Sequence, residues 1–169
     1  MRVFGLAGWS GSGKTTLLAA LIPEIVARGV TVSTVKHAHH AFDIDQPGKD
    51  SWRHREAGAR EVLIASERRW ALMRELRGDA EFSLDQLLTR LGPVDLVLVE
   101  GFKRHPHPKL EVHRAALGKP LIYPEDPCVV ALASDEQPAG LALPWLPLSD
   151  PTKIASFILD HQGLGACRS

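Results

Sequence analysis

Residues 8–16, with the sequence GWSGSGKTT, decide the fold of this chain. They follow the pattern Gly-x-x-x-x-Gly-Lys-Thr, which is typical of a phosphate-binding P-loop. Small residues let successive backbone N–H groups point inward and form a cradle for an anion. In such loops the lysine, here Lys14, reaches the β- and γ-phosphates, and the threonine hydroxyl, here that of Thr15, binds Mg²⁺. The stretch therefore predicts a site for the phosphates of a nucleotide.

The segments on either side of the loop support this prediction. Residues 2–7 (RVFGLA) are typical of a buried strand, and residues 17–27 (LLAALIPEIVA) carry the apolar stripe of a helix that packs on a sheet. Strand, loop and helix in this order are the context that a P-loop requires. We therefore favour a nucleotide site over a chance glycine-rich turn that carries a lysine.

Composition limits the class of protein. The chain has 169 residues, a size typical of one domain, and its 20 Lys and Arg residues balance 20 Asp and Glu residues. A neutral chain has no overall field to attract nucleic acid or an anionic membrane, and no apolar run reaches the roughly 20 residues that span a bilayer. Two cysteines and no signal peptide favour a reducing compartment. We expect one nucleotide-binding domain over residues 1–169, in the cytoplasm, with no nucleic-acid or membrane partner.

The remaining elements predict the fold class. Residues 31–37, 96–99 and 128–135 are β-branched or continuously apolar, as in strands buried within a parallel sheet. Residues 61–66 and 69–75 predict two short strands around a charged turn. Helices are expected at residues 51–59, at residues 84–91 after a capping box that starts at Ser83, and after Asp150. We predict an α/β fold of the P-loop NTPase type, with a mostly parallel, twisted sheet and helices on both faces.

Three aspartates after the second expected strand are candidate magnesium ligands. Residues 38–51 (AHHAFDIDQPGKDS) have no hydrophobic period, and nucleotide switches place magnesium and γ-phosphate contacts in such a segment. The candidates are Asp43, Asp45 and Asp50, and we favour Asp45 for the metal. For Asp50, a role in capping the next helix is equally well supported.

Glu100 is a second candidate for the metal. It ends the apolar strand at residues 96–99, in the Walker B position, where a carboxylate holds magnesium or orients the attacking water. A Glu-Gly turn at the end of a strand is common, but a P-loop in the same chain strengthens the assignment. Lys14 and Glu100 are therefore the candidate catalytic residues.

Asp135 and a group of histidines allow more than one interpretation. Asp135 stands at the carboxyl end of the strand expected at residues 128–135, where GTPases often hold a carboxylate that bonds guanine. A turn or a helix cap remains the alternative. A histidine cluster could hold a soft metal, although no Cys-x-x-Cys or His-x₃-His spacing supports zinc, and we favour phosphate neighbours or surface residues. The cluster consists of His37, His39, His40 and His54.

Four stretches together resemble the molybdopterin-guanine dinucleotide biosynthesis adaptor family, MobB. They are GWSGSGKTTLL, VKHAHHAFDIDQPGKDSWRHREAGA, IASERRWALM and DLVLVEGFK, and the resemblance runs from about Phe4 to Phe102. It implies a GTP-binding homodimer that assists the guanylyltransferase (MobA-type) in joining GMP to molybdopterin. Molybdopterin itself is a further implied ligand, and the resemblance implies at most slow, Mg²⁺-dependent GTPase activity.

The resemblance also implies site residues. By motif position, Thr15, Asp45 and Glu100 surround Mg²⁺. The phosphates of GTP contact Gly11, Ser12, Gly13, Lys14, Thr15 and Thr16. Two other functions stay open, namely a small-molecule kinase or ATP-dependent ligase of the same fold, and a metallochaperone GTPase. Arg53 and Arg55 are candidates for an arginine that acts across a dimer.

Overall fold

A computed structural model describes residues 1–38 and 42–165 of the chain. The chain divides into two compact units. The first, which we call the sheet unit, consists of Met1–His37 and the residues from Leu91 onward, and the second, the hairpin unit, is Ala38–Arg90. The P-loop lies in the sheet unit. The expectation of a single nucleotide-binding domain over residues 1–169 stays a prediction.

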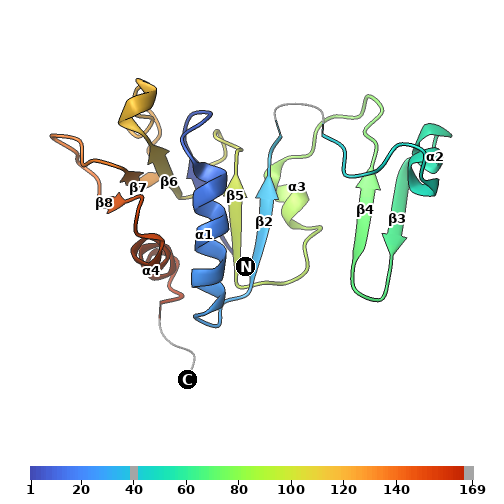
Figure 1. Cartoon of the computed structure of the whole chain (residues 1–169), viewed down its shortest axis with the longest axis horizontal. Helices are drawn as coiled ribbons and strands as arrows, with labels where there is room; N and C mark the ends of the chain where they lie inside the picture. The colour runs from blue at the N-terminus through green and yellow to red at the C-terminus, as the bar shows by residue number, and fades with distance from the viewer. Residues whose placement is uncertain (39–41, 166–169) are drawn as a thin grey trace. The chain divides into compact units, whose positions relative to one another are not determined.

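The sheet unit contains a six-stranded sheet in the order β2-β5-β1-β6-β7-β8 (Figure 1). Every neighbouring pair in it is parallel. Its strands are β1 (Arg2–Ala7), β2 (Val32–Lys36), β5 (Leu96–Glu100), β6 (Lys109–His113), β7 (Val129–Ser134) and β8 (Trp145–Pro147). This arrangement confirms the predicted α/β fold with a mostly parallel sheet. It places β5 directly beside β1, so the strands that lead into the P-loop and to Glu100 are neighbours.

Two helices cover one face of this sheet. Helix α1 (Lys14–Val26) and helix α4 (Pro151–His161) contact each other, and their buried side chains belong to the same hydrophobic core as Phe4 and Leu6 of β1. The N-cap of α4 is Asp150, whose carboxylate accepts the N–H of Lys153, as the sequence predicts. Each buried apolar side chain in this core contributes about 1.5–3 kcal/mol.

Loop residues cover the other face of the sheet at β1 and β6. The carboxylate of Glu111 is fully buried there and accepts the backbone N–H groups of Ile122 and Tyr123. His107 lies against Gly5, because a Cβ on Gly5 would be 2.3 Å from the Nε2 atom of His107. The first face is therefore apolar and covered by helices. This part of the second face carries the charged Glu111, which accepts hydrogen bonds from the backbone of a loop.

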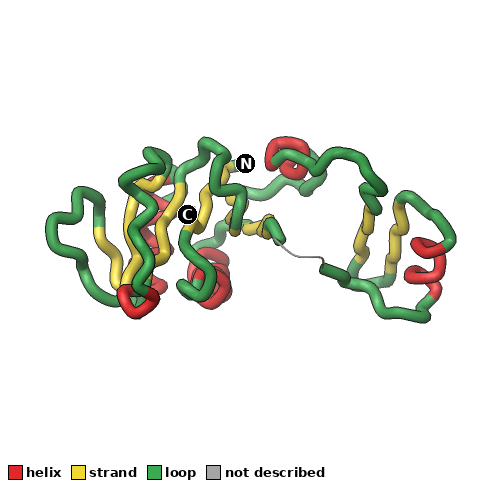
Figure 2. The backbone as a smooth tube through the Cα atoms, turned by 90° about the horizontal axis from the view of Figure 1, so that it is seen from above, coloured by secondary structure: helices red, strands yellow, loops and turns green. Residues whose placement is uncertain are grey.

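The hairpin unit contains the two short strands that the sequence predicts. Strands β3 (Glu61–Ala65) and β4 (Trp70–Arg74) pair antiparallel, and Figure 2 shows them side by side with α2 (Asp50–Glu56) next to them. Helix α3 (Leu84–Leu88) starts after the predicted capping box of Ser83 and Gln86 and ends earlier than predicted. The capping role considered for Asp50 is wrong, because Lys49 is the N-cap of α2 and Asp50 is the first helical residue.

The helices of this protein are short. The longest, α1, has 13 residues and contains Pro23 in its interior, where proline removes one backbone hydrogen bond. Within the part of the chain that the structure describes, no helix is both long and apolar enough to cross a bilayer.

Candidate functional site

The loop between β1 and α1 has the curled backbone of an anion cradle. Gly8, Gly11 and Gly13 have φ angles of 146°, 80° and 95°, which residues with a side chain rarely adopt. A Cβ on Gly8 would lie 2.4 Å from the carbonyl oxygen of Val112, so this position accepts only glycine. The loop opens onto the N-terminus of α1, where unpaired N–H groups and the helix dipole favour an anion.

Lys14 lies across this loop. Its Nζ atom donates to the carbonyl oxygens of Gly8, at 2.9 Å, and of Trp9, at 2.8 Å. Burial lowers the pKa of Lys14, Glu100 opposes this shift, and the cations Lys103 and Lys36 add to it. Several positive charges therefore surround the loop, as a site for a polyphosphate requires.

The structure brings Thr15 and Glu100 together across 85 residues of sequence. The hydroxyl of Thr15 donates to both carboxylate oxygens of Glu100, at 3.0 and 3.2 Å. Glu100 is 8% exposed, and the Nζ atom of Lys36 lies 3.7 Å from its Oε2 atom. Their closeness follows from sheet order, since Glu100 is in register with Leu6 at the end of β1.

This pair of oxygen donors fits magnesium. Mg²⁺ is usually held by one or two carboxylates together with substrate phosphates and water, rather than by a cage of protein ligands. Thr15 and Glu100 offer such a partial set beside the phosphate cradle. Within residues 1–38 and 42–165, no group of three or more His, Cys, Asp or Glu side chains is arranged to hold a metal ion. His39 and His40 lie outside the described residues, so the predicted histidine cluster is not described as a whole.

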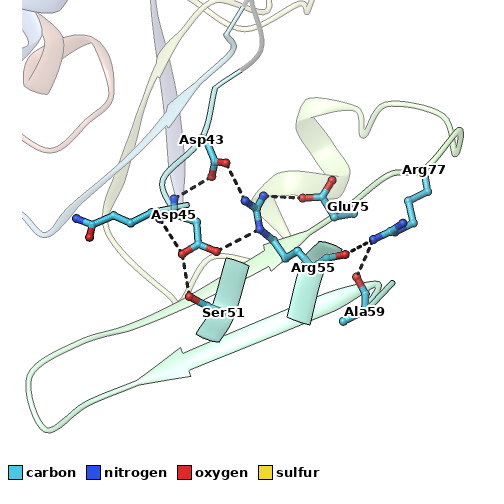
Figure 3. A network of polar contacts seen from close by, with 8 residues as sticks. Asp43, Asp45, Ser51, Arg55, Ala59, Glu75 and Arg77 are labelled. Atoms are coloured by element: carbon cyan, nitrogen blue, oxygen red, sulfur yellow. Dashed lines mark hydrogen bonds and ion pairs between the residues drawn. The ribbon is translucent and has the colours of Figure 1, made fainter. Parts of the chain in front are cut away.

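Asp45 belongs to the hairpin unit and lies in a polar network there (Figure 3). Its carboxylate accepts from the hydroxyl of Ser51 at 2.8 Å and from the Nε of Arg55 at 3.2 Å. The same guanidinium donates to Asp43 at 2.7 Å and to Glu75 at 2.8 Å. Asp45 thus has partners inside its own unit, and its assignment to magnesium stays a prediction.

Two groups of this network, Asp43 and Arg55, have shifted pKa values. The backbone N–H of Asp45 and the guanidinium of Arg55 hold the pKa of Asp43 below its usual range, and the pKa of Arg55 is raised, with the hydrogen bond to Asp43 as the largest cause. The Arg55 side chain is 13% exposed and donates to Asp43, Asp45 and Glu75. Its donors are engaged, which is unfavourable for the role across a dimer that the sequence suggests for it.

Asp135 follows β7 and faces the turn after β6. Its Oδ1 atom accepts the backbone N–H of Ala115 at 3.4 Å, and its Oδ2 atom lies 3.9 Å from Nη1 of Arg114. The alternative of a turn role is thus visible in the structure. Recognition of guanine by Asp135 stays a prediction.

One wall of the P-loop comes from a segment that sequence patterns did not single out. After β6 the chain forms a single 3₁₀ turn, Ala115–Leu117, and a Cβ on Gly11 would lie 3.7 Å from Leu117. Likewise, a Cβ on Gly13 would lie 3.5 Å from Nε of Arg114. The sequence signal nearest to this wall is a local excess of positive charge, because residues 103–114 contain four Lys and Arg residues. This excess suggests an anionic ligand or an acidic partner near the P-loop, but not that Arg114 lies against Gly13.

Trp9 connects the P-loop to the same wall. Its indole N–H donates to the carbonyl oxygen of Pro120 at 2.8 Å. The ammonium groups of Lys103 and Lys119 lie 5.4 and 5.9 Å from the centroid of its ring, within the range of cation–π attraction. The tryptophan therefore holds two further cations near the mouth of the loop.

Comparison with known proteins agrees with this geometry. The chain matches the family model of molybdopterin guanine dinucleotide synthesis protein B over residues 3–135. It is 46% identical over 159 residues to the molybdopterin-guanine dinucleotide biosynthesis adapter protein of Haemophilus influenzae, a match that covers 92% of this chain and 86% of that protein. The adapter protein of the same name from Escherichia coli K12 is 42% identical over 161 residues, which cover 94% of this chain and 91% of that protein.

A solved structure extends the similarity to the whole fold. A crystal structure of molybdopterin-guanine biosynthesis protein B has a TM-score of 0.76 and 30% identity, and the match covers 95% of this chain and 99% of that chain. The curled glycine loop, Lys14 and the Thr15–Glu100 pair lie within the matched residues. This chain therefore belongs to the molybdopterin guanine dinucleotide synthesis protein B (MobB) family.

Proposed function

We propose that this protein is a GTP-binding adaptor that assists the attachment of GMP to molybdopterin. The observation that carries the proposal is the Thr15–Glu100 pair beside a P-loop, in a chain of the MobB family. The two similar proteins named above are called molybdopterin-guanine dinucleotide biosynthesis adapter proteins. A phosphate cradle with a pair of oxygen donors suits a nucleotide–magnesium complex, and an adaptor needs to present such a complex rather than consume it.

In this proposal GTP lies with its phosphates on the P-loop. The contacts come from Gly11, Ser12, Gly13, Lys14, Thr15 and Thr16. Ser12 supports the assignment, because its Oγ atom is buried and has no hydrogen-bond partner among the described residues. Magnesium supplies positive charge against the phosphates when bound, and Thr15, Glu100 and Asp45 are its proposed ligands. Asp135 is the proposed guanine contact.

Hydrolysis by the isolated protein is at most slow in this proposal. Lys14 and Glu100 are the candidate catalytic residues, and in phosphoryl transfer an arginine typically adds a large further acceleration. Arg55 is engaged with three carboxylates of its own unit. This disfavours Arg55 as the source of such an acceleration.

The hairpin unit supports a homodimer. Leu63 and Leu72 are directly paired across β3 and β4 and are 61% and 46% exposed, and Trp70 near them is 67% exposed. A two-stranded hairpin is marginally stable alone, and an exposed apolar patch usually marks an interface. We propose that a second copy of this chain covers it. Sedimentation velocity tests this: Leu72→Asp should produce monomers, whereas Arg68→Asp in the exposed turn should not.

The proposed partner is the MobA-type guanylyltransferase, in the cytoplasm. Lys103 and Lys119 beside Trp9 present positive charge near the nucleotide, which suits the phosphate of molybdopterin or an acidic surface of the enzyme. Attraction of this kind weakens with salt, because exposed charges are screened beyond roughly 10 Å at 0.1 M ionic strength. A pull-down with the purified guanylyltransferase at low and high salt, with and without GTP, tests the partner.

Nucleotide titration tests the proposal as a whole. Calorimetry with a non-hydrolysable GTP analogue should show binding by the wild type and none by Lys14→Ala, while circular dichroism stays unchanged because Lys14 is not part of the core. Competition with ATP should leave most GTP bound. Equal displacement by ATP, together with rapid phosphorylation of a small acceptor, contradicts the adaptor and favours a kinase or ligase.

A further inference from the structure

Arg114 places a guanidinium against the P-loop. A Cβ on Gly13 would lie 3.5 Å from Nε and 3.6 Å from Nη2 of Arg114, so the planar group lies next to the glycine. Gly13 is the N-cap of α1, and no side chain caps this helix end. The N-terminus of a helix carries partial positive charge, so a cation there is unfavourable unless an anion lies beside it.

The protein itself compensates this charge only in part. In the part of the chain that the structure describes, the one carboxylate within ion-pair distance of Arg114 is Asp135, at 3.9 Å. The two side chains are 46% and 39% exposed to solvent, and an ion pair between such side chains contributes little to stability. A guanidinium has five N–H donors in a fixed fork. Most of the donors of Arg114 are therefore available for another partner.

Arg114 differs in this respect from Arg55, one of the two arginines that the sequence suggested for a role across a dimer. Arg55 is 13% exposed and donates to three carboxylates of the hairpin unit. Arg114 follows β6, the strand beside β1, and therefore belongs to the same unit as the P-loop. The forked geometry of arginine suits the oxygens of a phosphate, which can accept two N–H bonds at once.

We propose that Arg114 binds the phosphates of the nucleotide, as a second cation beside Lys14, and that Asp135 positions it. The inference rests on the proposed GTP-binding function and adds to it a residue that lies beyond Phe102. In this arrangement Lys14 approaches the phosphates from the loop itself and Arg114 from the end of β6. Asp135 orients the turn through its bond to the N–H of Ala115 and steers the guanidinium through its charge.

Calorimetry with two probes tests the proposal: GTP, and inorganic triphosphate, which has no base. Arg114→Ala should weaken both probes by about tenfold or more, since a hydrogen bond to a charged group has this magnitude. Arg114→Lys should restore part of the affinity for both. Arg104→Ala, a matched loss of one exposed cation in the same unit, should leave both affinities within about twofold.

Asp135→Asn separates positioning from base recognition. If Asp135 positions Arg114, this variant weakens the binding of triphosphate, which has no base, and that loss disappears in an Arg114→Ala background. A further loss seen with GTP alone belongs to the proposed guanine contact. Loss of GTP binding alone, with unchanged triphosphate binding, contradicts the positioning role. Thermal melting of each variant shows whether the fold is intact.

The outcomes for the two proposals are distinct. If the wild type binds neither probe, the nucleotide-binding function and this inference both fall. If the wild type binds both probes and Arg114→Ala binds them equally well, only the role of Arg114 is overturned.

Discussion

The hydroxyl of Thr15 donates to both carboxylate oxygens of Glu100, at 3.0 and 3.2 Å, at the mouth of the phosphate cradle. One residue is the second residue of α1 and the other is the last residue of β5. Because β5 lies directly beside β1 in the sheet, the order of the strands is sufficient to bring Thr15 and Glu100 together.

Glu100→Gln should reduce the magnesium dependence of GTP binding and preserve binding of the phosphates. The amide keeps the shape of the side chain but loses the charge that attracts Mg²⁺. The ratio of the GTP affinities measured with and without MgCl₂ should be about tenfold lower than in the wild type, equivalent to about 1.4 kcal/mol. Glu125→Gln, an exposed glutamate of the same unit, is the control. A wild-type ratio in Glu100→Gln contradicts the metal assignment.

Asp45→Asn tests whether the network around Arg55 also serves magnesium. If Asp45 is a magnesium ligand, this substitution should lower the ratio of the GTP affinities measured with and without MgCl₂. Ser51→Ala removes a hydrogen bond to the same carboxylate but keeps its charge, so it should leave the ratio unchanged. If Asp45→Asn lowers the stability of the protein and leaves the ratio at its wild-type value, Asp45 is a structural residue of the hairpin unit.

Gly5→Ala should destabilise the sheet unit. The added Cβ would lie 2.3 Å from Nε2 of His107, and overpacking of this kind costs about 1–3 kcal/mol. Gly92→Ala is the matched control, because a Cβ there meets nothing within 4 Å. Urea denaturation measures both variants. Equal free energies of unfolding for the two variants contradict the close contact between Gly5 and His107.

His107 should make stability depend on pH. It is 4% exposed, and burial, with help from Lys109 and His105 and against Asp126, lowers its pKa from 6.5 to about 4. The unfolded chain binds a proton on this residue below about pH 6.5, whereas the folded protein does not. The contribution of His107 to the free energy of unfolding is therefore at its full value above pH 6.5. It should fall by up to about 3 kcal/mol as the pH falls to 4.

Substitution isolates this contribution. His107→Gln should flatten the dependence of stability between pH 6.5 and 4, whereas His54→Gln, an exposed histidine of the hairpin unit, should leave it as in the wild type. Urea denaturation at half-unit pH steps measures the slope. An unchanged slope in His107→Gln assigns the dependence to other groups.

Local patterns alone were sufficient for several features of this fold. The P-loop, the apolar strand that ends at Glu100 and the capping box at Ser83 depend on residues within one or two turns of chain, and each formed as predicted. Backbone conformation and hydrogen bonding at these places are set by near neighbours, so the residue types carry the information. The contact between Glu100 and Thr15, in contrast, depends on the order of the strands in the sheet.

Contacts between distant segments could not be read in this way. Arg114 lies against Gly13, and His107 lies against Gly5, only because β6 pairs with the other side of β1. Two of the carboxylates around Arg55 come from the loop before α2 and the third, Glu75, directly follows β4, and no spacing relates them. Sequence patterns indicate which face of a segment is buried and which is exposed. These contacts depend instead on which strand lies beside which. That choice is made by the packing of the whole sheet, so it is visible only in the folded chain.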